Sequence, residues 1–189
     1  MKMIIKATMT FALVLLATGC SGKNAAMQGK DSGLNLKGKT VYIKSDKAAY
    51  SSDSRIAQNI KNECSLDTKL INFIKNSADK NGVTIKITDS IPSDAIELKV
   101  EITDSISSGN AFIGHRKFTS ISGNLTQAGA TVGTFEAARR SGGGAFGGFK
   151  GSCAVLGRTV EALGSDVGKW LLKPSTGASL GDTGLIPRR

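Results

Sequence analysis

The segment 95–103, "AIELKVEIT", constrains the fold of this chain more than any other. Apolar residues occupy every second position there and charged residues fill most of the places between, the apolar set being Ile96, Leu98, Val100 and Ile102. Successive side chains of a β-strand point to opposite faces, so this pattern predicts a strand with one buried and one solvated face. Strands of that kind are typical of antiparallel sheets.

Four other segments carry strand-like patterns, at 40–44, 83–88, 118–126 and 131–139. The last two flank "QAGA", residues 127–130, which predicts a hairpin turn between them.

Two further segments, 54–79 and 153–172, repeat apolar residues every three or four positions and predict amphipathic helices. We expect the first helix to break near Ser65, whose hydroxyl can cap a new helix start. Each glycine inside a helix costs up to about 1 kcal/mol against alanine, so close packing on the sheet is the expected reason for those in the second helix. They are Gly157, Gly164 and Gly168.

The elements follow one another in the order β-α-β-β-β-β-α, or close to it. We therefore predict an α+β fold, with a mostly antiparallel sheet and two helices packed on one of its faces. The domain is expected to span residues 39–173, after a flexible tether at 20–38 and before a disordered tail at 174–189.

The N-terminus carries a targeting signal that is excluded from the fold. Two lysines precede a short uncharged apolar run that ends in small residues, which is typical of a secretory signal. Residues 17–20, "ATGC", resemble the lipobox of bacterial lipoproteins, with alanine where that motif usually has leucine. The resemblance implies removal of residues 1–19, palmitate-type acylation of Cys20 and insertion of its acyl chains into a bilayer; Ser21 then points to the periplasmic side of the outer membrane. The alternative is an ordinary signal peptide that releases a soluble periplasmic protein.

The charge balance is basic, with 25 Lys and Arg against 15 Asp and Glu and a formal net charge of +10. The basic residues are scattered, and no aromatic RNP box, helix-turn-helix signal or zinc-finger spacing accompanies them, so no nucleic-acid partner is expected. Aromatic residues make up only 5% of the chain, which disfavours a surface that stacks on sugar rings.

Cys64 and Cys153 are the only cysteines left once Cys20 is lipidated. An even count in an oxidising compartment predicts a Cys64–Cys153 disulfide. The alternative is a reactive Cys153 thiolate at a helix N-terminus, with the single histidine, His115, as its base.

The glycine-rich stretch after the last predicted strand contains G-x-G-x-x-G at Gly142, Gly144 and Gly147. A dinucleotide fingerprint also needs a second parallel strand after the helix, and we expect none beyond Pro174, so no cofactor is predicted. One histidine and two cysteines lack even a minimal zinc set with local spacing, so no metal site is predicted either.

Predicted loops at 104–117 and 141–152 would lie at the same end of an up-down-up sheet. Glycine-rich backbone and basic side chains there suit an anionic group or a partner's carboxylates. The alternative is a solvated basic rim that binds nothing. The candidate binding patch consists of His115, Arg116, Lys117, Arg139, Arg140 and Lys150.

The lipobox, the β-α start, the segment 121–144 and the final amphipathic helix together resemble a family of bacterial lipoproteins with a small α+β domain. The layout over residues 39–172 is more distantly similar to lipoproteins that activate penicillin-binding proteins or build the curli secretion channel. This resemblance implies a non-enzymatic envelope adaptor or assembly factor that binds an envelope protein or an anionic glycan such as peptidoglycan, with no catalytic residue. The alternative is a small periplasmic hydrolase or thiol enzyme that uses Cys153 or His115.

Overall fold

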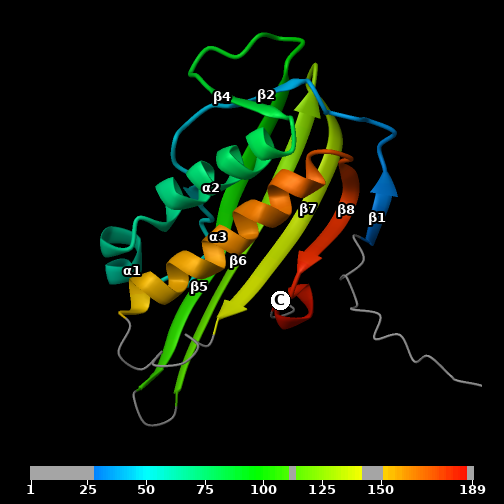
Figure 1. The fold of residues 1–189 in the computed structure, drawn as a ribbon. Helices are drawn as coiled ribbons and strands as arrows, with labels where there is room; N and C mark the ends of the chain where they lie inside the picture. Colours follow the sequence, from blue (N-terminus) through cyan, green and yellow to red (C-terminus); the bar gives the residue numbers. More distant parts are fainter. Residues whose placement is uncertain (1–27, 111–113, 142–150, 187–189) are drawn as a thin grey trace, which may run out of the picture.

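The computed structural model describes residues 28–110, 114–141 and 151–186, which form an α+β fold and confirm the predicted class (Figure 1). The strands are β1 (Gln28–Asp31), β2 (Thr40–Ile43), β3 (Ala49–Tyr50), β4 (Thr84–Ile87), β5 (Ile96–Asn110), β6 (Gly114–Gln127), β7 (Ala130–Ser141) and β8 (Ser175–Gly181). The helices are α1 (Gln58–Glu63), α2 (Leu66–Lys80), α3 (Ser152–Trp170) and the 3-10 turn η2 (Thr183–Leu185).

The described strands form one sheet in the order β1-β8-β7-β6-β5-β2-β4, with β3 added beside β5. The three long strands, β5, β6 and β7, pair antiparallel. The shorter β2 pairs in parallel with both β4 and β5, and β8 pairs in parallel with β7. All the helices except η2 lie on one face of this sheet, as Figure 1 shows, and the apolar core lies between them and the strands.

Strand β5 follows the predicted alternation, because Leu98 and Ile102 are buried toward the helices while Glu101 is exposed on the opposite face. A β-bulge lies between Ile102 and Asp104 and inserts one extra residue into the strand. Beyond the bulge, the helix-facing positions are held by serines rather than by apolar residues.

The prediction of a loop over residues 104–117 was wrong. Residues 104–110 continue β5 and residues 114–117 begin β6, so the two strands form one long hairpin. Cross-strand hydrogen bonds hold this polar stretch in the sheet, since its register runs without further shift from Asp104 to Asn110.

The predicted break in the first helix is confirmed at Ser65, which separates α1 from α2. Its mechanism differs from the one expected, because the Ser65 side chain makes no capping hydrogen bond. The residue instead has a left-handed backbone with φ of 49°, which redirects the chain so that Leu66 becomes fully buried.

Two of the α3 glycines, Gly164 and Gly168, pack against α2 and not against the sheet, contrary to expectation. A Cβ atom on Gly164 would lie 2.4 Å from the Cβ of Phe73, and one on Gly168 would lie 2.3 Å from the hydroxyl of Ser77. Gly157 has no such neighbour, because nothing lies within 4 Å of its Cβ position.

The predicted disordered tail was wrong for residues 174–186, which hold β8 and η2. The predicted tether is also shorter than expected, because β1 adds to β8 and Leu36 is 2% exposed. Both segments are polar and glycine-rich, and their order comes from pairing with neighbouring strands rather than from local apolar pattern. The domain therefore includes residues 28–38 and 174–186 in addition to the predicted 39–173.

Strand β8 also overturns the expectation that no strand follows Pro174. It pairs in parallel with β7 and is joined to it through α3, so β7, α3 and β8 form a β-α-β unit. The glycines that precede α3 in the motif, Gly142, Gly144 and Gly147, lie outside the described residues.

Candidate functional site

The six residues of the predicted basic patch do not form one described surface. The side chains of His115, Arg116 and Lys150 lie outside the described residues. Lys117 and Arg139 both contact α3 and so belong to the helix-covered face of the sheet. Arg140, the neighbour of Arg139, is exposed on the opposite face, because successive residues of a strand alternate between faces.

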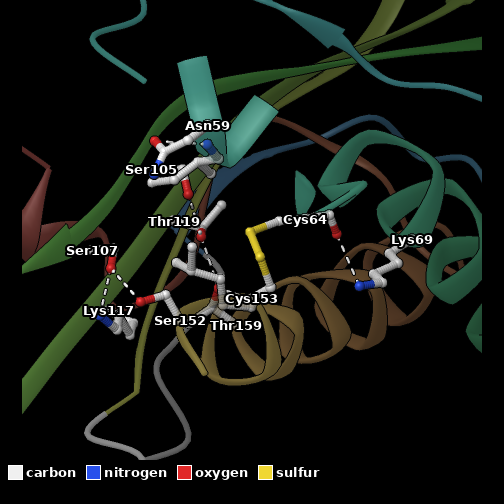
Figure 2. Close-up of a disulfide and its surroundings, with 12 residues drawn as sticks. Asn59, Cys64, Lys69, Ser105, Ser107, Lys117, Thr119, Ser152, Cys153 and Thr159 are labelled. Atoms are coloured by element: carbon white, nitrogen blue, oxygen red, sulfur yellow. Dashed lines mark hydrogen bonds between the residues drawn. A yellow bond between two sulfur atoms is a disulfide. The ribbon is translucent and has the colours of Figure 1, made fainter. Parts of the chain in front are cut away.

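Lys117 is buried near the start of β6, with 1% of its surface exposed. Its ammonium donates to the hydroxyls of Ser107 in β5 and Ser152 at the start of α3, the latter at 3.2 Å (Figure 2). The Ser107 hydroxyl also donates to that of Ser152 at 3.1 Å. Burial lowers the pKa of Lys117 below its ordinary value of 10.5, because it penalises the charged form.

A row of hydroxyls continues from this lysine beneath α3, as Figure 2 shows. Thr119 lies 2.7 Å from Thr159 of α3 and 3.5 Å from Ser105 of β5, and all three are buried. Thr159 in turn donates to the backbone carbonyl of Leu156 at 2.7 Å. These contacts satisfy the polar groups that replace apolar side chains at this end of the core.

Arg139 is engaged in ion pairs and is therefore not available as a free cation. Its guanidinium makes two hydrogen bonds to Asp166 of α3, at 2.7 and 2.8 Å, and lies 3.8 Å from Asp182. The hydrogen bond with Asp166 raises the pKa of Arg139. Asp182 also accepts the backbone N–H of Arg140 at 3.2 Å. The arrangement joins β7 to α3 and to the turn after β8.

A disulfide joins Cys64 to Cys153, as the sequence predicts (Figure 2). It links the junction of α1 and α2 to the first turn of α3. Lys69 donates to the carbonyl of Cys64 at 2.9 Å and holds the same junction. A thiol enzyme based on Cys153 would have no free thiolate while this bond is intact.

The face of the sheet without α1, α2 and α3 carries a groove of about 1040 Å³. Its floor is polar and is contributed by β5, β6, β7 and β8, and its rim includes Arg55 and the η2 turn. The residues that line it are Arg55, Thr103, Asp104, Ile106, Ser120, Ile121, Ser122, Glu136, Ser179, Thr183, Gly184 and Ile186.

Two carboxylates give this groove its chemical character. Asp104 is half-buried, and its Oδ1 atom is enclosed with no hydrogen-bond partner in the described part of the chain. Glu136 is exposed on the adjoining part of the floor. Ile106 is 41% exposed beside them and adds an apolar contact surface. This groove was not predicted from the sequence, because Asp104 and Ile106 were assigned to a loop.

Within the described ranges, no group of three or more His, Cys, Asp and Glu side chains could hold a metal ion. No helix in those same ranges is both long and apolar enough to span a bilayer.

No protein-family model matches the chain, and no curated protein matches it in sequence. Several solved structures resemble its fold. PelC from Paraburkholderia phytofirmans, a dodecamer, is 13% identical over 73% of this chain and 92% of its own, with a TM-score of 0.46. A minor lipoprotein from Acinetobacter baumannii is 14% identical over 73% and 98%, with a TM-score of 0.44. A lipoprotein from Neisseria meningitidis is 10% identical over 66% and 94%, with a TM-score of 0.42. At such low similarity, function has to be argued from the residues of this chain.

Proposed function

We propose that this chain is a lipid-anchored envelope protein that binds a partner protein in the groove on the helix-free face of its sheet and has no catalytic role. The observation that carries the binding role is the groove itself, a polar hollow of about 1040 Å³ on a rigid sheet. The lipobox-like "ATGC" at residues 17–20 supports the anchor, and Ser21 supports its placement in the outer membrane.

The lining of the groove favours one kind of partner. Asp104 and Glu136 are carboxylates with no ion pair to any described cation, so they complement lysine or arginine side chains. Serine and threonine hydroxyls supply further hydrogen bonds. The same carboxylates would repel an anionic glycan, which we therefore do not place in this groove.

A photo-crosslinking amino acid at Ser122, on the groove floor, tests the binding role in intact cells. We expect a discrete protein adduct from position 122 and none from Lys75, an exposed residue of α2 on the opposite side of the sheet. Adducts to glycan alone, or equal adducts from both positions, would refute a protein partner in the groove.

A matched pair of variants tests the role of the groove carboxylates. Asp104→Asn should reduce capture of the crosslinked partner, because the enclosed carboxylate is the group that a basic side chain would meet. Glu101→Gln removes a carboxylate from the same strand outside the groove lining and should leave capture unchanged. Equal loss in the two variants would show a general charge effect instead.

The anchor is tested separately by labelling cells with palmitate. Wild-type chain should carry the label and Cys20→Ala should not. Equal labelling, or a mature N-terminus at another residue, would contradict the anchor without touching the groove.

A further inference from the structure

Arg55 is a cation at the rim of the groove that no described carboxylate neutralises. The residue is exposed and lines the same hollow as Asp104 and Glu136. It forms an ion pair with neither of them, nor with any other carboxylate in the described part of the chain. The groove therefore contains one unpaired positive group and two unpaired negative groups. A partner whose charges are all of one sign cannot complement all three.

The backbone on both sides of Arg55 is held in place, so the side chain extends from a fixed point. On one side, the Ser51 N–H donates to the carbonyl of Ile102 in β5 at 3.0 Å. On the other side, Ile56 is 7% exposed and packs in the apolar core. These contacts hold the segment beside the β5 bulge, next to which Asp104 lies.

Asp104 and Glu136 are too far apart to bind the same cation. Asp104 is on β5 and Glu136 is on β7, with β6 between them. Neighbouring strands lie about 4.8 Å apart, so the two residues are separated by about 10 Å across the sheet. Their side chains project from the same face and therefore do not converge. The groove thus offers separate positions for two basic groups and, at Arg55, a third position for an acidic group.

We infer that Arg55 is a specificity-determining residue, because of which the groove binds a partner segment that carries an acidic side chain beside its basic ones. The acidic side chain meets Arg55, and the lysines or arginines meet Asp104 and Glu136. A segment with basic residues alone places a cation against Arg55, and like charges facing each other across an interface disfavour the complex. This role of Arg55 rests on the proposed binding of a protein in the groove.

The yield of the protein adduct from a photo-crosslinking residue at Ser122, measured in cells with the full chain, tests this role. Arg55→Gln should lower the yield about fivefold, because a charged contact with the partner is lost, and Arg55→Lys should keep most of it. Arg158→Gln removes an exposed arginine of α3 outside the groove lining and should behave like wild type. The Tm of Arg55→Gln should match wild type, since the side chain is exposed and unpaired in the described chain.

The outcomes separate the role of Arg55 from the binding role of the groove. Equal adduct yields in wild type and Arg55→Gln would overturn the role of Arg55 and leave the groove as a protein-binding site. A loss that Arg158→Gln shares would also overturn it, because the effect would come from net charge. Absence of any protein adduct from Ser122 in the wild-type chain would contradict the proposed function, and the role of Arg55 with it.

A random library of eight-residue peptides, selected on the immobilised full chain in detergent, measures the charge preference directly. Peptides bound by wild type should carry Asp or Glu together with Lys or Arg. Arg55→Glu should instead select peptides with basic residues only, because the groove then holds three carboxylates. Selection of basic-only peptides by wild type, or an acidic preference that persists in Arg55→Glu, would overturn the inference.

Discussion

The contact between α2 and α3 can be tested by giving Gly164 a side chain. A Cβ at this position would lie 2.4 Å from the Cβ of Phe73, 2.8 Å from its carbonyl carbon and 2.9 Å from the backbone nitrogen of Ile74. Two of these atoms belong to the α2 backbone, so no change of rotamer can relieve the overlap. The two helices must therefore separate in Gly164→Ala.

Gly157 provides the matched control in the same helix, because nothing lies within 4 Å of its Cβ position. Both substitutions gain up to about 1 kcal/mol of helix propensity. Only Gly164→Ala also overpacks the core, at a cost of about 1–3 kcal/mol. The difference in unfolding free energy between the two variants isolates that cost.

Guanidinium unfolding of the oxidised chain measures this difference. We expect Gly157→Ala to be more stable than wild type and to exceed Gly164→Ala by about 1–3 kcal/mol. Equal stability of the two alanine variants would show that the helices do not approach as closely as described, and the reasoning would fail.

Three further predictions concern covalent and electrostatic contacts. Replacing Cys64 and Cys153 by serine should lower the unfolding free energy by up to about 4–5 kcal/mol, since the disulfide closes a loop with a sequence separation of 89. A loss below about 1 kcal/mol in urea unfolding would contradict this. Asp166→Asn should lower the unfolding free energy by about 1.5–3 kcal/mol, because it weakens the ion pair with Arg139. In a double-mutant cycle with Arg139→Met, the two losses should not add; additive losses would argue against the ion pair. In phosphate-free buffer, wild type should gain stability relative to Lys117→Met as pH rises toward 10.5, because the folded chain binds this proton less tightly than the unfolded chain; a pH-independent difference would count against the lowered pKa.

The sequence predicted those elements whose pattern arises from one buried face. Leu98, Val100 and Ile102 alternate with charged residues, and the sequence predicted this first part of β5 correctly but not its continuation to Asn110. The apolar positions of α3 recur at helical spacing, and this helix was predicted close to its actual bounds. The disulfide was predictable as well, because only two cysteines remain once Cys20 is set aside.

The elements that the sequence did not predict, β8 and the second half of β5, are held in place by residues that are distant in sequence. Strand β8, "STGASLG", contains two glycines and mostly small polar residues, yet it lies between β7 and β1 and is hydrogen-bonded to both. The hydroxyl-rich end of β5 was predicted as a loop for a similar reason. A bulge shifts its alternation, and its helix-facing serines pair with hydroxyls instead of apolar groups, Ser105 with Thr119 of β6 and Ser107 with Ser152 of α3.

The candidate site was misplaced because charge alone does not indicate burial. Lys117 stands in a polar stretch and was predicted to be exposed, whereas it is buried and donates to the hydroxyls of Ser107 in β5 and Ser152 in α3. Arg139 and Arg140 are adjacent and were grouped together, although a strand sends them to opposite faces. The groove depends on four strands and η2 meeting in space, which no local pattern encodes.

The early start of β1 limits how far this domain can stand from a membrane. If Cys20 bears acyl chains, the covalent path to Gln28 covers residues 20 to 28, and an extended chain spans at most about 3.6 Å per residue, or about 29 Å in all. In that case β1, at the edge of the sheet, stays close to the membrane surface. A partner protein for the groove would then have to approach the membrane, so membrane-embedded proteins and other anchored domains would encounter the groove at a higher local concentration than freely diffusing proteins.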